Sequence, residues 1–204
     1  MDNRSDSAVE APRSEPSLDP RERIVAAADA LFYARGVRAV GMDDVRTEAG
    51  VSLKRLYGLF PGKDDLVLEV LRRRHVMWTE GLTAAMEGAS GAREKLLAVY
   101  DFLAQWFTED TFRGCAFINV FGELAPLSSE VAASVREHKR SFQDELSRIV
   151  ASAGLDPSLA PQLAILAEGA QTTAAIDGSP VAAAHARRAA ETLIDAAADP
   201  DAQA

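Results

Sequence analysis

The chain has 204 residues, which is enough for one domain of moderate size or two small ones. Its hydrophobic fraction of 48% and charged fraction of 26% are typical of a folded globular protein and exclude a disordered or collagen-like chain. No apolar run approaches the roughly 18 to 20 residues of a membrane span, and the polar N-terminus lacks a signal-peptide pattern. We therefore expect a cytoplasmic protein that does not contact a membrane.

The net charge of −9 is unevenly distributed along the chain. Residues 1–19 sum to −3, residues 20–63 to +3 and residues 64–204 to −9. Because an acidic surface repels phosphates, the average charge argues against nucleic-acid binding, but the segment 20–63 is an exception. Any phosphate-binding surface is expected there.

The sequence of the N-terminal third predicts an unstructured arm that is followed by short helices. Residues 1–19 are polar and have few apolar groups, so we expect them to be disordered. Apolar residues at helical spacing predict a helix over about 20–35, which Gly36 ends. A short helix is expected from about Met42 to Ala49, before Gly50, and a third runs from its cap Ser52 to Phe60.

The rest of the chain also predicts helices. A long fourth helix begins after Gly62 and keeps an apolar period over about six turns. Breaks near residues 88–91, 110–114, 125–129, 154–157 and 178–180 separate about five more helices. No stretch alternates long enough for a strand, and no internal repeat is present. The expected fold is all-α, with about nine helices.

The two short helices between residues 43 and 60 carry the strongest functional signal. Their apolar residues can face the first helix, which leaves Lys54 and Arg55 on the outer side of the third. A short helix with an exposed, basic N-terminal turn is what a helix-turn-helix presents to the major groove of DNA. From the residues alone, a merely solvated face explains these charges equally well. The candidate DNA-binding residues are Arg46, Ser52, Lys54, Arg55, Tyr57 and Lys63.

The run from Ile24 to Leu71 resembles the N-terminal DNA-binding domain of the tetracycline-repressor-like (TetR) transcriptional regulators. The resemblance rests on the Ala-Leu-Phe-x-x-x-Gly ending of the first helix, the Ala-Gly-Val-Ser turn at 49–52, and the pattern Leu56-Tyr57-x-x-Phe60-x-x-Lys63. It implies a three-helix helix-turn-helix domain followed by a helical ligand-binding and dimerisation domain. On this basis we divide the chain into an arm (1–19), a DNA-binding domain (20–65, continuing into the fourth helix) and a sensing domain (66–204).

Four positions depart from the pattern of that family: 41, 46, 58 and 59, the last two of which are commonly aromatic or histidine in the family and are Gly58 and Leu59 here. Gly41 stands where a hydroxylated residue is common, but glycine is also an acceptable helix cap. Gly58 has no side chain, which shifts the expected base contacts to Lys54 and Arg55. Arg46 stands where a small residue is usual, and it either adds a phosphate contact or projects into solvent.

The sensing domain is rich in aromatic residues between positions 100 and 121. These residues form either an ordinary core or, in part, the wall of a pocket for a small apolar effector, because ligand sites are mostly apolar with a few directed polar groups. Trp78 on the fourth helix can reach the same region, although core packing explains it as well. The candidate ligand-binding residues are Phe102, Trp106, Phe117, Asn119, His138, Glu168 and Gln171.

Catalytic, metal and redox sites have little support. Cys115 is the only cysteine, which excludes an intrachain disulfide and a zinc finger built from paired thiolates. We interpret it as a buried small residue, with a redox sensor as the alternative. The three histidines have no metal-ligand spacing, and the chain lacks a phosphate-binding glycine loop and a nucleophile elbow, so we expect no metal, cofactor or enzymatic activity.

The sequence thus predicts a one-component regulator, favoured as a repressor that a small ligand releases from a palindromic operator on double-stranded DNA. The alternatives are a ligand-independent or architectural DNA-binding protein and a helical enzyme. A homodimer is expected through the last two helices, about 158–177 and 180–198. The face chosen for the partner consists of Ala182, Ala186, Ala190, Leu193, Ile194 and Ala197.

Overall fold

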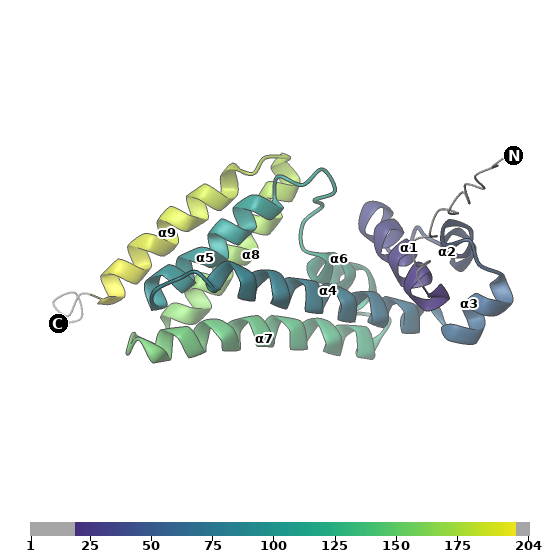
Figure 1. Cartoon of the computed structure of the whole chain (residues 1–204), viewed down its shortest axis with the longest axis horizontal. Helices are drawn as coiled ribbons and strands as arrows, with labels where there is room; N and C mark the ends of the chain where they lie inside the picture. Colours follow the sequence, from purple (N-terminus) through teal and green to yellow (C-terminus); the bar gives the residue numbers. More distant parts are fainter. Residues whose placement is uncertain (1–18, 199–204) are drawn as a thin grey trace, which may run out of the picture.

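The computed structural model describes residues 19–198, and these form nine α-helices without a strand, as the sequence predicts (Figure 1). The expected unstructured arm lies outside the described residues except for Asp19, which is the N-cap of the first helix. The helices are α1 (Pro20–Arg35), α2 (Met42–Ala49), α3 (Leu53–Leu59), α4 (Lys63–Met86), α5 (Ala92–Trp106), α6 (Ala116–Leu124), α7 (Ser129–Ser152), α8 (Leu159–Asp177) and α9 (Val181–Ala198).

Local capping interactions set the ends of α1, α2 and α3. The Asp19 carboxylate accepts a hydrogen bond from the Arg21 amide at 3.3 Å, and Pro20 occupies the first helical position, where its missing N–H costs nothing. Gly50 ends α2 with a left-handed φ of 61°, a conformation that glycine adopts at no steric cost. Two residues later, Ser52 caps α3.

One apolar core joins α1–α4 to α6 and the beginning of α7. It includes residues of the first three helices such as Ile24 and Leu56, and it also includes Phe117, Val120 and Leu124 of α6. The side chains of Val131 and Val135 of α7 complete it. A segment more than 50 residues further along the chain therefore packs together with the first three helices.

A second core fills the other end of the molecule. It begins on α4 at Leu82 and takes in the buried faces of α5, α8 and α9 and the later turns of α7. In Figure 1 the long helices α4 and α7 run between the two ends, with α1–α3 at one end and α5, α8 and α9 at the other. The helix α4 therefore contributes side chains to both cores. None of the helices between residues 19 and 198 combines the length and apolarity that crossing a membrane requires.

Two expectations about helix faces are wrong. Ala186, Ala190 and Ile194 of α9, assigned above to a partner subunit, are buried inside the protomer against its own core. Small residues allow close approach to any helix, and here that helix is in the same chain. The apolar stripe that helical spacing predicts for the fourth helix includes Met77, but Met77 is 52% exposed.

Candidate nucleic-acid interface and effector cavity

The helices α2 and α3 form a compact pair that packs against α1. Val45, Ala49, Leu56 and Phe60 are buried, as predicted, whereas Val51 is only half-buried. The left-handed cap at Gly50 turns the chain between the two helices, and its N–H donates to carbonyls at the end of α2. This is the geometry of a helix-turn-helix, in which the second helix is free to enter a DNA groove.

The outer face of α3 is exposed and positively charged. Lys54 and Arg55 are exposed, and neither forms an ion pair with a carboxylate among residues 19–198. Ser52 accepts a hydrogen bond from the Arg55 amide at 3.2 Å, which fixes the first turn of α3. The Tyr57 ring is 46% exposed on the same helix. The two cations are therefore available to phosphates or base edges.

The other two candidate DNA contacts are less available. Arg46 forms an ion pair with Asp43 at 2.7 Å, so its charge is already balanced within α2. Lys63 is half-buried at the start of α4, where its ammonium lies 5.9 Å from the centre of the Phe32 ring. Burial lowers the pKa of Lys63, while the nearby carboxylate of Glu123 opposes this shift.

Ion pairs attach α1 to α4. The Glu69 carboxylate accepts hydrogen bonds from Arg72 and, at 2.8 Å, from Arg21, and these bonds lower the pKa of Glu69 to about 2. Further along the same pair of helices, Arg74 contacts Asp29 at 2.5 Å, and these two side chains are largely buried. Partly buried pairs of this kind hold the two helices in one register.

A cavity of about 720 Å³ lies between α1 and several of the later helices of the chain. Its volume is within the usual range of small-molecule sites. Residues of α1 form one wall, and residues of α4, α5, α7, α8 and the segment before α6 form the others. Its aromatic and polar lining includes Tyr33, Trp78, Phe102, Trp106, Phe117, His138 and Gln171.

Trp78 lies at the centre of the aromatic wall. Its ring contacts Phe102, Trp106 and Phe142 edge to face, with ring centres 5.3, 5.9 and 5.5 Å away. Such edge-to-face pairs fix the rings relative to one another. The wall is therefore a preorganised surface suited to a flat, apolar molecule.

Two histidines, His75 and His138, add polar atoms to the aromatic wall of the cavity. The Nδ1 atoms of His75 on α4 and His138 on α7 are 3.0 Å apart, so one must carry a proton and the other must accept it. The His138 ring also stacks on Phe117, with ring centres 3.5 Å apart. Burial lowers the pKa of His138 to about 3, and the nearby Lys139 and His75 contribute to the shift. His138 is therefore neutral at pH 7.

Five of the seven predicted ligand-binding residues line this cavity: Phe102, Trp106, Phe117, His138 and Gln171. The other two do not. Asn119 donates a hydrogen bond to the Arg113 carbonyl at 3.0 Å and lines a smaller cavity, and Glu168 forms an ion pair with Lys139 at 3.5 Å. Cys115 is buried, as expected, and its Sγ lies 3.6 Å from the Lys139 Nζ.

Sequence reasoning missed the contribution of α1 to this cavity. The residues Ala26, Ala30 and Tyr33 were assigned only to the DNA-binding domain, because their spacing indicates nothing about the sensing helices that pack beside them. The charged residues Arg73 and Arg113 near the cavity were also missed. Within residues 19–198, no group of three or more histidine, cysteine or acidic side chains is placed to hold a metal ion.

The buried neutral state of His138 predicts a pH-dependent stability. Unfolded His138 takes up a proton near pH 6.5, whereas folded His138 stays neutral until about pH 3, so this stabilisation is complete above pH 6.5 and is lost as the pH falls. Between pH 7 and pH 5 we expect a loss of about 1 to 2 kcal/mol from this group. The stabilisation from the ion pairs of Glu69 is lost only when the pH falls below about 4.5, so it changes little between pH 7 and pH 5.

Denaturant unfolding at pH 7, 6 and 5 measures this effect. His138→Asn should flatten the pH dependence relative to the unmodified chain, whatever its effect on stability at pH 7. The control is His185→Asn, which removes an exposed histidine on α9. Equal pH dependence in His138→Asn and the unmodified chain would contradict the account.

Comparison with known proteins agrees with this geometry. Residues 24–70 match the family described as bacterial regulatory proteins, tetR family. The HTH-type transcriptional activator FasR of Mycolicibacterium smegmatis is 28% identical over 151 residues, covering 74% of this chain and 68% of the relative. An uncharacterized HTH-type transcriptional regulator of Mycobacterium tuberculosis is 29% identical over 159 residues, covering 72% of this chain and 78% of that protein.

The fold agrees over a larger part of the chain. The crystal structure of a TetR-family transcriptional regulator from Streptomyces coelicolor superposes with a TM-score of 0.83 and 27% identity, covering 88% of this chain and 96% of the other. Both the N-terminal helices and the helical domain that follows them are thus shared with solved regulators of one kind. Residues 24–70 therefore carry the N-terminal domain described for the tetR family of regulatory proteins, and the described chain has the fold of a TetR-family transcriptional regulator.

Proposed function

We propose that this regulator binds a palindromic operator as a homodimer and acts as a repressor that a small, mainly apolar ligand releases from DNA. The observation that carries the proposal is the position of the cavity of about 720 Å³, one wall of which belongs to α1 of the DNA-binding domain. A molecule held there touches the sensing helices and the DNA-binding domain at once. It can therefore favour one arrangement of the two over another.

Operator recognition is assigned to the outer face of α3. Arg55 and Lys54 are exposed there and lack carboxylate partners among the described residues, while Ser52 and Tyr57 lie where they can reach phosphates. An arginine can donate two hydrogen bonds to one guanine, whereas a phosphate contact strengthens binding to every sequence alike. Arg55 is therefore the expected source of base discrimination.

The substitution Arg55→Ala should relax the preference for one base pair by about 1 to 3 kcal/mol, because a bidentate contact to guanine is lost. Fluorescence anisotropy with a selected operator and its single-base variants, at several salt concentrations, measures this preference. The control is Arg140→Ala, which removes an exposed arginine of α7 outside the DNA-binding domain. If Arg55→Ala keeps the full base preference, another residue reads the operator.

The homodimer is assigned to the exposed faces of α8 and α9. On α8, Ile165, Gly169, Thr172 and Ile176 are exposed at helical spacing, and the two isoleucines are 70% and 78% exposed. Large exposed apolar side chains in a row are typical of an interface. Two helices from each subunit would form a four-helix bundle, and a two-fold dimer would match the symmetry of a palindrome.

A charge at the C-terminal end of that stripe should separate the subunits. Ile176→Glu should give a monomer at micromolar concentration in sedimentation experiments, together with a large loss of operator affinity, because a carboxylate would lose its hydration in the interface. Leu127→Glu is the control, since Leu127 is 72% exposed but lies before α7, outside the stripe. A dimeric Ile176→Glu protein would show that the interface lies elsewhere.

The ligand is assigned to the aromatic wall. Its rings suit a flat apolar body, and the buried Gln171 and the neutral His138 provide polar groups that can orient the ligand. If the ligand binds more tightly to the conformation that does not fit the operator, DNA must weaken the ligand by the same factor. Such coupling is typically about 1 to 3 kcal/mol, or roughly 5- to 150-fold in affinity.

Thermal-shift screening of uncharged one- and two-ring aromatic compounds should find a ligand. Its dissociation constant, measured with and without saturating operator, should then differ by roughly 5- to 150-fold. Trp106→Ala should raise the dissociation constant in both cases, because it removes a large part of the wall. Equal affinities with and without operator would contradict release by that ligand and favour a ligand-independent DNA-binding protein.

A further inference from the structure

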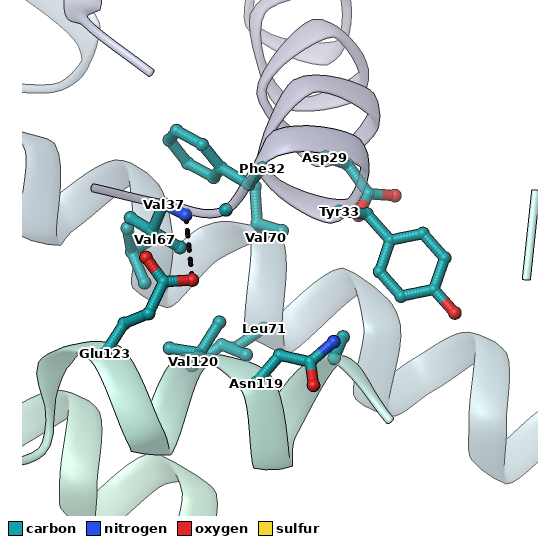
Figure 2. A pocket seen from close by; sticks show the side chains of 12 residues that line it. Asp29, Phe32, Tyr33, Val37, Val67, Val70, Leu71, Asn119, Val120 and Glu123 are labelled. Carbon is teal, nitrogen blue, oxygen red and sulfur yellow. Dashed lines mark hydrogen bonds between the residues drawn. The ribbon is translucent and has the colours of Figure 1, made fainter. Parts of the chain in front are cut away.

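The short helix α6 lies near α1 in the middle of the molecule (Figure 1), and its first residues, Ala116 and Phe117, line the larger cavity together with residues of α1. Its side chains Phe117, Val120 and Leu124 are buried in the core that it shares with α1–α4. Near its beginning, Phe117 also lines the cavity and stacks on His138. Near its end, Glu123 points toward the chain that follows α1 (Figure 2). One helix of nine residues thus contacts both functional regions.

The Glu123 carboxylate binds two consecutive backbone amides of the DNA-binding domain. Its Oε1 accepts a hydrogen bond from Val37 at 3.1 Å, drawn in Figure 2, and its Oε2 accepts one from Arg38 at 2.8 Å. Each oxygen has its own donor, so the carboxylate is held at two points and cannot be replaced by a group with one acceptor. The side chain is half-buried, which strengthens these charge-assisted bonds relative to exposed ones.

The amides of Val37 and Arg38 lie in the short connection between α1 and α2, whose conformation sets where α2 begins. Gly36 ends α1 with a φ of +84°, which favours glycine, and a Cβ added there would lie 3.1 Å from the Glu123 Oε1. The side chains of Val37 and Val40 are buried, and Gly41 is the N-cap of α2. Fixing the amides of residues 37 and 38 therefore fixes the position from which the helix-turn-helix starts.

A second contact joins the same two parts of the chain. The Tyr33 hydroxyl donates a hydrogen bond to the Gly114 carbonyl at 2.7 Å and accepts one from the Arg113 amide at 2.9 Å. The segment 113–123 is thus attached to α1 before α6 begins and again near its end. Between these attachments, α1, α4 and α6 enclose a smaller cavity of about 130 Å³, lined mostly by apolar side chains (Figure 2).

We propose that Glu123 is a positioning residue for DNA binding. Although it lies outside the DNA-binding domain, its carboxylate holds the connection between α1 and α2 and so sets the position of α2 and α3 for the operator. Phe117, which precedes it by about two turns of helix, places the same α6 against the cavity wall. Movement of α6 therefore changes the hold of Glu123 on the helix-turn-helix. This role requires no ligand to be bound.

The direction in which operator affinity changes in Glu123→Gln distinguishes positioning by Glu123 from a purely electrostatic effect of its charge. Glu123 lies near Lys63, and its negative charge opposes the approach of phosphate. Removing that charge should tighten DNA binding if electrostatics alone matters. If Glu123 acts by positioning, Glu123→Gln should instead weaken binding to the selected operator, by roughly five- to fifty-fold, because an amide has only one acceptor oxygen for the two donors.

The experiment compares the full-length protein with Glu123→Gln, Glu123→Ala and the control Glu80→Gln, which removes an exposed carboxylate of α4. Operator affinity is measured by anisotropy, and backbone hydrogen exchange is measured in the free protein. We expect weaker operator binding in both Glu123 variants, with faster exchange at the amides of Val37 and Arg38 and unchanged exchange in the core of α4. Glu80→Gln should leave operator affinity unchanged or slightly higher.

Two results would overturn the proposal: operator affinity that is equal or higher in Glu123→Gln, or weaker binding without faster exchange at Val37 and Arg38. Glu123→Gln keeps the size of the side chain, so it remains informative if Glu123→Ala fails to fold. Neither measurement uses an effector. Failure would therefore leave the proposed ligand release untouched, and failure to find a ligand would leave the role of Glu123 testable.

Discussion

The apolar core shared by α1–α4, α6 and the beginning of α7 fixes the position of the first three helices relative to the rest of the molecule. Because Phe117, Val120 and Leu124 are buried together with Ile24 and Leu56, the DNA-binding helices cannot change their position relative to α6 without exposing apolar surface or repacking. Packed interiors of this kind have a few discrete arrangements and do not deform continuously. A regulator built on such a core can switch between states when a contact at its edge is changed.

The larger cavity lies at that edge, where the first core ends and the second begins. Trp78 is on α4 between Leu71, in the first core, and Leu82, in the second, and its ring organises the aromatic wall. The helix α4 connects the two ends of the molecule, but the contacts of Tyr33 and Glu123 provide a second connection through the segment 113–123. Two connections restrict the movement of the DNA-binding domain more than a single helix would. Rotation of the domain about α4 would break the hydrogen bonds that Tyr33 and Glu123 form in the second connection.

The sequence predicts the local features of this molecule well and the long-range ones poorly. Helix ends such as Ser52, Gly36 and Gly50 could be predicted because caps and left-handed turns depend on neighbouring residues. The buried face of α9 could not, since small residues pack equally well against the same chain or a partner. Glu123 gave no signal at all, because its amide partner Val37 is 86 residues away and a backbone donor leaves no trace in the residue pattern.

If the proposed ligand release is correct, the DNA-binding domains move when the cavity is filled. Pulsed electron resonance between spin labels at the exposed Ala39, introduced as cysteines in a Cys115→Ala background, measures the separation of the two DNA-binding domains in the proposed dimer. With operator bound, the account predicts one narrow distance distribution, because half-sites lie about 34 Å or a multiple of this apart. A cavity ligand should shift or broaden that distribution as operator is released. An unchanged distribution at saturating ligand, with the cavity occupied, would contradict the account.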